Sequence, residues 1–252
     1  MSLLEVRSVR KAFGGVVVLD DVSMQVSPGQ VCSVIGPNGA GKSTLFDIVA
    51  GVTPCDSGSI LLDGVDVTRM RPDQRAARGL ARTFQELRLF DTLTAHENIA
   101  AAPLCASRSS LAGILLGSRA EREDRERAEA LADELLTRLR LQHRRDVAVG
   151  LLSHGQKRLI EIGRALALSP RLLILDEPTS GLNAENKALF IETVLPSLRA
   201  GVQGIVVIEH DMDVVMSISD KVVVLANGRK IAEGTPAEVQ RDPVVAREYL
   251  GT

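Results

Sequence analysis

The chain has 252 residues, of which 45% are hydrophobic, and its formal net charge is −2 at pH 7. This length allows one large or two small domains, and a charge so close to zero gives no overall basic field for nucleic acid or anionic lipid. The apolar runs fall far short of the ~18 residues of a membrane span, and the N-terminus lacks the apolar core of a signal peptide. The cysteines are odd in number and lack C-x-x-C spacing, which favours a reducing cytosol and argues against zinc: Cys32, Cys55 and Cys105.

Two apolar segments near the N-terminus, Leu3 to Val6 and Val16 to Leu19, are predicted to be β-strands. Phe13 lies between them, directly before two glycines, in a chain with only 2% aromatic residues. A phenylalanine in this place could belong to the core, or its ring could lie on an early loop and stack on a base. The residues alone leave both interpretations open.

Residues 36–44 read GPNGAGKST and match the phosphate-binding pattern G-x-x-x-x-G-K-[ST]. An apolar strand at Val31 to Ile35 precedes this loop, and an apolar segment at Leu45 to Ala50 continues it as a helix. Glycines let the backbone curl so that successive N–H groups face one anion, and a helix starting near Lys42 adds its positive end. We expect Lys42 to reach the β- and γ-phosphates and Ser43 to offer its hydroxyl to Mg²⁺. An ordinary glycine-rich turn is the alternative, but it leaves the flanking strand and helix unexplained.

A β-hairpin is predicted next, because Ile60 to Leu62 and Val65 to Val67 flank Asp63-Gly64. This dipeptide is typical of a type I′ turn, in which both central residues have positive φ. The N-terminal part of the chain is therefore expected to be an antiparallel β region next to the phosphate-binding core.

The middle of the chain is predicted to contain one long amphipathic helix from Arg119 to Leu139. Its charged residues include both signs at i,i+4 spacing, which favours a solvated helix face over a partner contact. Residues 101–118 are rich in Ala, Ser, Gly and Leu, and we expect a loop or an irregular helical connection there. Six apolar residues recur at helical spacing and predict the buried stripe: Ala128, Leu131, Ala132, Leu135, Leu136 and Leu139.

A second apolar strand, Leu172 to Leu175, ends in Asp176-Glu177-Pro178. A strand that ends in an acidic residue is where a P-loop ATPase holds Mg²⁺, directly or through water, and Asp176 fits that role. Glu177 would be aimed at the γ-phosphate, where a general base orients the attacking water. The two carboxylates could instead be helix N-caps.

The motifs along the chain resemble, in order, those of ABC ATPases, and the resemblance covers essentially the whole sequence. Leu152 to Gln156 read LSHGQ, which resembles the LSGGQ signature with His154 in place of the middle glycine. The other elements are Phe13 as the A-loop aromatic, GPNGAGKST as Walker A, Gln85 as the Q-loop, LLILDEP as Walker B, SGLN at Ser180 to Asn183 as the D-loop, and His210 after the strand Ile205 to Ile208 as the switch histidine. Asn183 also departs from the family, which usually has aspartate there.

The resemblance implies an α/β fold: a P-loop NTPase core with a mainly parallel sheet, an antiparallel β subdomain and an inserted helical subdomain at about 88–160 that carries the signature. It implies one ABC domain over residues 1–252, with ATP and Mg²⁺ as cofactors. Glu177, His210 and Gln85 would be catalytic, and Ser43, Gln85 and Asp176 would hold the metal. The nucleotide would contact Phe13, Gly36, Pro37, Asn38, Gly39, Ala40, Gly41, Lys42, Ser43, Thr44, Ser153, Gly155, Gln156 and Asn183.

Two such subunits pair head to tail in ABC ATPases, so that the signature of one closes over the ATP of the other. Ser153, Gly155 and the helix behind them offer a hydroxyl, bare N–H groups and a positive dipole to an anion. The side chain of His154 is expected to point away while the backbone binds. The partner subunit could be a second copy of this chain or a paralogue.

Three strings look like importer subunits for branched-chain amino acids and for the related urea system. They are ARTFQELRLFDTLTAHENI around Gln85, IEHDMDVVMSISD around His210, and the C-terminal AEGTPAEVQRDPVVAREYLG. The last string contains a helix capping box at Thr235 to Glu238, so part of it is generic. The resemblance implies transmembrane permease subunits as partners, a solute-binding protein indirectly, and a peripheral location on the cytoplasmic face of the bacterial inner membrane.

The segment after Gln85 is too apolar for a plain exposed loop. It could be a helix packed into the core, or a groove that receives a short cytoplasmic helix of the permease. Its residues are Leu87, Leu89, Phe90, Leu93 and Thr94.

Functions of another class are also open to ABC ATPases, which include proteins of DNA repair, chromosome architecture and the ribosome. Those proteins carry a coiled-coil insertion, a zinc module or a second cassette, and the sequence shows none of these. We therefore expect no nucleic-acid partner. A P-loop GTPase or kinase would leave the signature unexplained.

Overall fold

The computed structural model describes residues 2–83, 87–106 and 119–250, which form two compact units. The first unit comprises Met1–Arg82, Arg171–Pro178 and Val202–Thr252, and the second comprises Thr83–Pro170 and Thr179–Gly201. Among the described residues, no helix combines the length and the hydropathy that crossing a bilayer requires.

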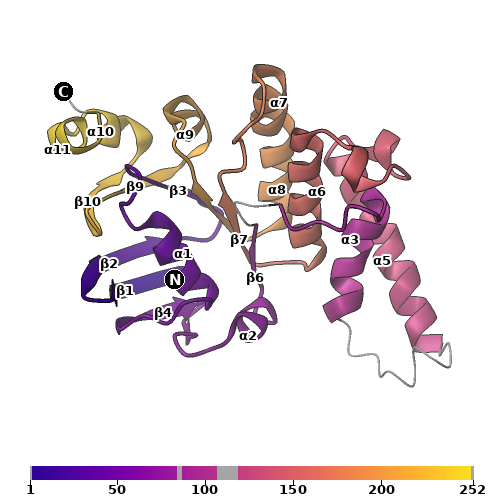
Figure 1. Cartoon of the computed structure of the whole chain (residues 1–252), viewed down its shortest axis with the longest axis horizontal. Helices are drawn as coiled ribbons and strands as arrows, with labels where there is room; N and C mark the ends of the chain where they lie inside the picture. The colour runs from indigo at the N-terminus through magenta and orange to yellow at the C-terminus, as the bar shows by residue number, and fades with distance from the viewer. Residues whose placement is uncertain (1, 84–86, 107–118, 251–252) are drawn as a thin grey trace. The chain divides into compact units, whose positions relative to one another are not determined.

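Two β-sheets form the first unit (Figure 1). The four-stranded sheet is antiparallel, in the order β2 (Val16–Val26), β1 (Leu4–Phe13), β4 (Ser57–Leu62) and β5 (Val65–Asp66). The six-stranded sheet has the order β10 (Arg229–Gly234), β9 (Lys221–Ala226), β3 (Val31–Ile35), β8 (Gly204–Ile208), β7 (Leu172–Asp176) and β6 (Leu80–Arg82). All of its neighbouring pairs are parallel except β10 with β9. The predicted fold class is confirmed.

Both faces of the six-stranded sheet are covered by apolar side chains. Alternate residues of β9 belong to two different clusters: Val223 and Leu225 pack with the helix α1 (Lys42–Ala50), whereas Val222 and Val224 pack with C-terminal residues such as Val239. This alternation follows from the two-residue period of a strand. The C-terminal helices are α9 (Met212–Ile218), α10 (Pro236–Gln240), α11 (Pro243–Val245) and a π-helical turn η4 (Ala246–Leu250).

A buried arginine donates hydrogen bonds to the carbonyl groups at the C-terminal end of α1. Arg75, from the short helix α2 (Pro72–Ala76), is 2% exposed. Its guanidinium donates to the carbonyl oxygens of Ile48 at 2.6 Å and Val49 at 2.7 Å, and to that of Thr68 at 2.8 Å. The last carbonyls of a helix have no partner within it, so this arginine satisfies groups that would otherwise be buried alone.

The predicted hairpin at Asp63-Gly64 is confirmed, with Leu62 paired to Val65 and φ values of 49° and 75° at the two turn residues. Of the two interpretations of residues 101–106, the loop was wrong, because the helix α3 (Ala95–Ala106) continues through them. Pro103 lies inside this helix, where proline removes one backbone hydrogen bond without ending the helix. Residues 107–118 lie outside the described part of the chain.

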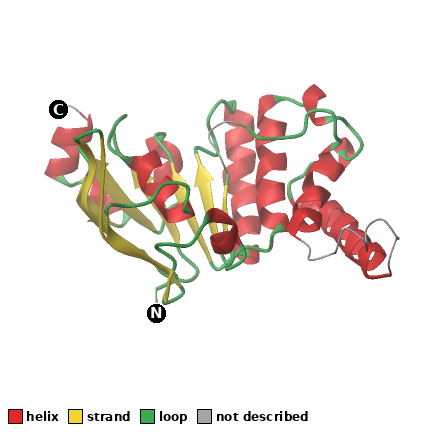
Figure 2. Cartoon of the chain, turned by 60° about the horizontal axis from the view of Figure 1, so that its bottom comes forward, coloured by secondary structure: helices red, strands yellow, loops and turns green. Residues whose placement is uncertain are grey.

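The second unit is helical, as the red ribbons of Figure 2 show. The predicted long helix is α5 (Arg119–Arg138), and five of its six predicted stripe residues are buried, with Leu131 half-buried. The other elements are η1 (Gln142–Arg144), η2 (Val149–Leu151), α6 (His154–Ala167), α7 (Ala184–Leu189), the π-helical η3 (Phe190–Val194) and α8 (Leu195–Gly201).

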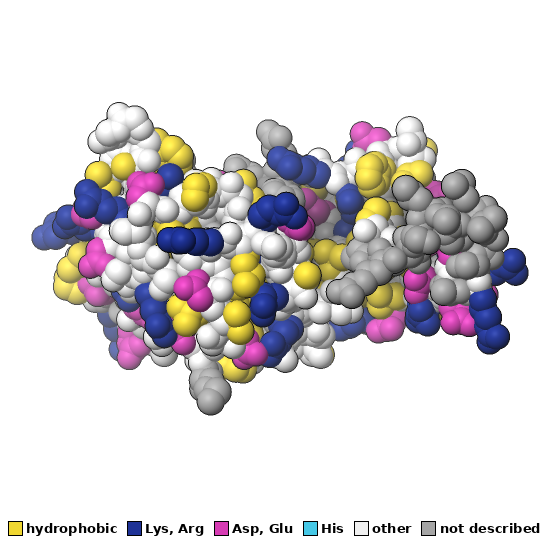
Figure 3. Space-filling view, turned by 90° about the horizontal axis from the view of Figure 1, so that it is seen from below, with side chains coloured by type: hydrophobic (Ala, Val, Ile, Leu, Met, Phe, Trp, Pro, Cys, Tyr) yellow, Lys and Arg dark blue, Asp and Glu magenta, His cyan; other side chains and the backbone are white. Residues whose placement is uncertain are grey.

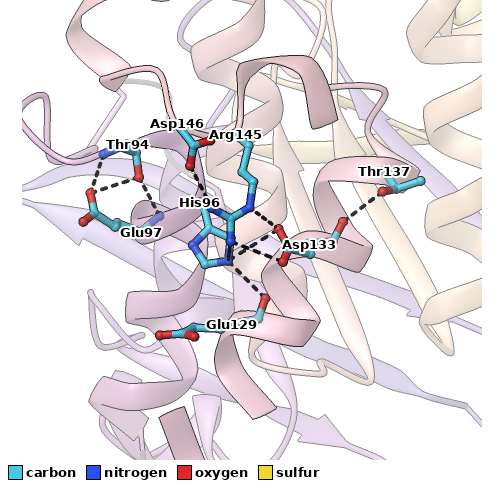
Figure 4. Close-up of polar contacts among 8 residues, drawn as sticks. All are labelled: Thr94, His96, Glu97, Glu129, Asp133, Thr137, Arg145 and Asp146. Atoms are coloured by element: carbon cyan, nitrogen blue, oxygen red, sulfur yellow. Dashed lines mark hydrogen bonds and ion pairs between the residues drawn. The ribbon is translucent and has the colours of Figure 1, made fainter. Parts of the chain in front are cut away.

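A polar cluster joins α3, α5 and the segment after η1 (Figure 4). His96 is 7% exposed, and its Nε2 lies 3.1 Å from the carbonyl oxygen of Glu129 and 3.6 Å from Asp133 Oδ1. Arg145 donates to Asp133 Oδ1 at 2.7 Å and to Asp146 Oδ1 at 2.7 Å. These polar contacts add to the packing of buried apolar residues, such as Ile99 and Leu135, that α3 and α5 also contribute.

Candidate active site

The phosphate-binding loop leaves β3 and enters α1, as predicted. Gly36 has a φ of 153°, and a Cβ added to it would lie only 2.1 Å from the carbonyl oxygen of Leu225. Gly41 is the N-cap of α1, with a φ of 95° and no side-chain cap. Because only glycine fits at both positions, the loop keeps its curl, and the first N–H groups of α1 keep their open end.

Lys42 lies across this loop. Its Nζ donates to the carbonyl oxygens of Gly36 at 2.7 Å and Pro37 at 3.0 Å. Burial lowers the pKa of Lys42, whereas the negative charges of Glu177 and Asp176 act in the opposite direction. The ammonium is therefore held among carbonyl oxygens and near two carboxylates, where a phosphate oxygen can replace the loop carbonyls as its partner.

The carboxylate of Asp176 ends β7 and is almost fully buried at 4% exposure. Arg82, at the end of β6, donates to Asp176 Oδ2 at 2.9 Å and to Asp47 Oδ1 of α1 at 2.6 Å. The guanidinium thus connects the helix behind the phosphate loop to the strand end that carries the acidic pair. The helix-cap interpretation of Asp176 and Glu177 was wrong, because the next helix begins at Ala184 and its N-cap is Asn183.

Glu177 has an unusual backbone for a residue other than glycine, with a φ of 47°. Its N–H donates to the carbonyl oxygen of Ile208 at 2.9 Å, which ties it to the end of β8. Its carboxylate lies 3.6 Å from Nδ1 of His210, and both side chains remain partly accessible. A strained conformation of this kind persists only where the surrounding structure imposes it, and such residues gather at functional sites.

Glu209 also faces His210, and no motif indicates it. It is 1% exposed, its Oε2 accepts the N–H of His210 at 3.2 Å, and it lies 4.0 Å from His210 Nδ1. The ring of His210 is therefore near two carboxylates, one at the surface and one buried. The only sequence signal was a charged residue directly after the apolar strand β8.

Phe13 lies at the end of β1 and is 49% exposed. This exposure excludes the interpretation of Phe13 as a core residue. An exposed aromatic ring on the unit that carries the phosphate loop is available for stacking.

The signature residues begin α6 in the second unit. Ser153 is the N-cap, and its hydroxyl accepts the N–H of Gln156 at 3.3 Å while Gln156 Oε1 accepts the N–H of Ser153 at 3.1 Å. A Cβ added to Gly155 would lie 2.8 Å from Leu182, and one added to Gly181 would lie 3.1 Å from the His154 ring. The signature and the D-loop-like segment therefore pack on each other, with His154 lying against the latter.

Asn183 is the N-cap of α7, and its Oδ1 accepts the N–H of Asn186 at 2.9 Å. An asparagine performs this capping as well as an aspartate would. The loss of charge at this position therefore leaves the local structure intact.

Gln85 lies outside the described residues. In the apolar segment that follows it, none of the five predicted contact residues is fully buried, and Phe90 is 51% exposed. Arg164 of α6 lies over the Phe90 ring at 5.1 Å and donates to the carbonyl oxygen of Arg88. Because the helix α3 begins only at Ala95, this segment is not a core helix.

The ABC transporter family model matches residues 19–180. This chain belongs to the ABC transporter ATP-binding family. A second family model, described as a branched-chain amino acid ATP-binding cassette transporter, matches residues 229–252.

Three curated relatives resemble this ABC protein along nearly its whole length. The high-affinity branched-chain amino acid transport ATP-binding protein BraF of Pseudomonas aeruginosa is 38% identical over 251 residues, covering 99% of this chain and 98% of BraF. The lipopolysaccharide export system ATP-binding protein LptB of Escherichia coli is 34% identical, covering 100% of this chain and 98% of LptB. LivG of Escherichia coli, also a high-affinity branched-chain amino acid transport ATP-binding protein, is 34% identical, covering 99% of this chain and 98% of LivG.

Two solved ABC cassettes have the same fold. One, in its ADP conformation, has a TM-score of 0.85 and 34% identity, and the other, nucleotide-free, has a TM-score of 0.85 and 33% identity. Both alignments cover 100% of each chain. This ABC subunit is an ATPase whose hydrolysis of ATP is coupled to transport.

The donor set around the phosphate loop suits Mg²⁺. Within the described residues there is no group of three or more His, Cys, Asp or Glu side chains that could hold a metal by themselves. Mg²⁺ is commonly bound by one or two protein oxygens together with phosphate oxygens and water, rather than by a cage of carboxylates. A serine hydroxyl at Ser43 and the buried carboxylate of Asp176 therefore fit this ion.

Proposed function

We propose that this ABC ATPase energises the uptake of branched-chain amino acids through a permease at the cytoplasmic face of a bacterial inner membrane. The observation that carries the choice of solute is the match of residues 229–252 to the branched-chain amino acid cassette family, which supports the interpretation of the C-terminal string. BraF and LivG, both named for branched-chain amino acid transport, support it along the full length.

The reaction that we propose uses the phosphate loop, the acidic strand ends, Gln85 and His210. The phosphate loop presents backbone N–H groups or close packing to the phosphates, and Lys42 supplies a positive charge. The other loop residues in this role are Gly36, Pro37, Asn38, Gly39, Ala40, Gly41 and Thr44. Glu177 takes a proton from the attacking water while His210 holds the γ-phosphate. Ser43, Gln85 and Asp176 would hold Mg²⁺, which neutralises charge on the transferring phosphoryl group.

The second nucleotide-binding surface is proposed to act on the ATP of a partner subunit. Ser153, Gly155 and Gln156 lie at the first turn of α6, whose dipole favours an anion. Ser153 accepts a hydrogen bond from the backbone, so its hydroxyl proton is still available to a phosphate oxygen. Asn183 would contribute a hydrogen bond across the same interface.

Export of lipopolysaccharide is the second candidate, because LptB matches 100% of this chain at 34% identity. A urea or amide importer is a further alternative. On the face drawn in Figure 3, Lys and Arg side chains are interspersed with Asp and Glu, so this face gives no support to a nucleic-acid partner.

The solute can be identified by recovering the chain with its membrane subunits from a membrane extract and reconstituting them in vesicles. We expect ATP-dependent uptake of labelled leucine, isoleucine or valine, with Glu177→Gln as the inactive control. Uptake of urea alone, or ATP-dependent movement of lipopolysaccharide, would contradict the proposed solute.

The docking site for the permease is proposed to include the segment from Leu87 to Thr94. Leu89→Glu should detach the chain from its membrane subunits while leaving its ATPase activity without them largely unchanged, because an unpaired carboxylate is costly only where an interface buries it. Leu168→Glu, at another partly exposed leucine of the same unit, is the control and should not detach it. Equal detachment by both variants would place the docking site elsewhere.

A further inference from the structure

Lys11 makes two contacts at the end of β1. Its Nζ donates to Asp56 Oδ1 at 2.9 Å, and the same nitrogen lies over the ring of Phe13, 5.1 Å from the centroid. This distance is within the range of a cation–π interaction. Lys11 is 9% exposed, whereas the ring that it covers on one side is 49% exposed.

Asp56 attaches this lysine to the backbone around it. Its Oδ2 accepts the N–H of Ala12 at 2.7 Å, and its own N–H donates to the carbonyl oxygen of Arg10 at 2.9 Å. The hydrogen bonds from Lys11 and Ala12 lower the pKa of Asp56, so its carboxylate stays charged at neutral pH. The end of β1 is therefore held by Asp56 at three consecutive residues, Arg10, Lys11 and Ala12, and the ammonium of Lys11 has a fixed counter-ion.

This arrangement has a consequence for a ring that binds a base. Gly14 and Gly15 follow Phe13 with φ values of 52° and 88°, and an added Cβ at either would meet nothing within 4 Å, so these two residues lie in open space beside the strand end. A side chain that is immobilised only on binding loses conformational entropy at that moment. A ring already held by Lys11 loses less, and it presents its other face to the base.

We propose that Lys11 and Asp56 are positioning residues that hold Phe13 ready to stack on the adenine of ATP. The proposal rests on the stacking role of Phe13. It requires that Lys11 contribute to binding of the base and not to binding of the phosphates, which lie at the loop of Gly36 to Lys42.

The affinities of the full chain for ATP and for inorganic tripolyphosphate, a triphosphate without a base, separate these two contributions. Lys11→Met should weaken ATP binding by about three- to tenfold, the scale of one cation–π contact, and should leave tripolyphosphate binding within about twofold. Lys11→Arg should restore ATP binding, since a guanidinium can also lie over a ring and pair with Asp56. Lys230→Met is the matched control, because it removes the same charge from an exposed pair with Glu233 and should change neither affinity.

A double-mutant cycle tests whether Lys11 acts through the ring. In a Phe13→Ala background, Lys11→Met should have no further effect on ATP binding. Equal losses for ATP and tripolyphosphate would show that Lys11 acts on the phosphates, and no loss for either would show that it positions nothing; each result overturns the proposal.

Two further outcomes keep the proposal falsifiable. If Lys11→Met does not fold, Asp56→Asn, which keeps the shape and one acceptor oxygen, should show the same loss for ATP alone, and an unchanged ATP affinity overturns the proposal. If Phe13→Ala binds ATP normally, base stacking itself fails. If Phe13→Ala weakens ATP binding and Lys11→Met does not, only the positioning pair fails.

Discussion

The two units present their functional residues in different ways. In the first unit, Asp176 and Glu209 are buried at strand ends, and Asp176 is held there by a charged partner, Arg82. In the second unit, Ser153 and Asn183 are exposed at helix ends, where they cap the first turns. The acidic residues are thus fixed inside the first unit, whereas the capping residues lie on the surface of the second unit.

This difference has a physical cause. A charge that leaves water needs a fixed partner, and Arg82 supplies one for the buried carboxylate of Asp176. Exposed capping groups need no partner beyond their own helix, so they can meet another molecule without reorganisation. Mutations of the acidic residues in the first unit should therefore impair ATP hydrolysis, and mutations in the signature should impair formation of the dimer.

The largest effect is expected for Glu177→Gln. A general base contributes about 10²–10⁴-fold to a rate, so steady-state hydrolysis should fall by at least two orders of magnitude. ATP binding should persist, because glutamine keeps the shape and the backbone hydrogen bond to Ile208. An ATP-bound dimer should accumulate in size-exclusion chromatography. Activity within about twofold of the parent would remove Glu177 from the mechanism.

A nearly complete loss is also expected for Ser153→Arg, but by another route. The dilute monomer should bind ATP with unchanged affinity, whereas dimerisation and hydrolysis should fail together, because bulk and charge enter the partner's site. Ser153→Ala is the control for the lost cap, which alone costs about 0.5–2 kcal/mol of stability. Weakened ATP binding by the monomer would show that the signature acts on its own nucleotide.

The sequence predicted the elements that depend on local pattern. The strand β3, the phosphate loop and the end of β7 are each encoded by a contiguous run, so they were predicted at nearly their observed bounds. Arg82 and Lys11 could not be found in this way, since their partners lie 94 and 45 residues away in the chain. The composition of residues 101–118 left a loop and an irregular helical connection equally open, because the packing of α3 against neighbouring helices is not visible in a local pattern.

A smaller effect is expected on stability, and replacing one arginine in each unit compares how much each contributes to the free energy of unfolding. Arg75 of the first unit is 2% exposed and serves several carbonyl oxygens, so Arg75→Met should lower the free energy of unfolding by about 2–4 kcal/mol. The side chain of Arg145 in the second unit is 42% exposed, and Arg145→Met should cost no more than about 1 kcal/mol. Urea unfolding of both variants tests this order. A greater loss for Arg145→Met would show that the polar cluster, and not the end of α1, is the more sensitive point.

The smallest effect is a dependence of stability on pH that involves Asp133. The hydrogen bond from Arg145, with a smaller contribution from the charge of His96, lowers the pKa of Asp133 below its ordinary value of 3.8. A carboxyl group whose pKa is lower in the folded state stabilises the protein above its unfolded pKa, and this stabilisation is lost as the pH falls through the folded pKa. Between about pH 5 and pH 2 the parent should therefore lose stability slightly more steeply than Asp133→Asn.

The effect is small because the side chain of Asp133 is 50% exposed, so water screens its pairing with Arg145. Glu134→Gln is the matched control: it neutralises the next residue of α5, whose side chain is 62% exposed and lies 3.6 Å from Arg138. The unfolding temperatures of the parent, Asp133→Asn and Glu134→Gln across this pH range test the prediction. Parallel curves for the parent and Asp133→Asn would mean that the cluster of Figure 4 orders the helices through hydrogen bonds alone, without a net electrostatic contribution.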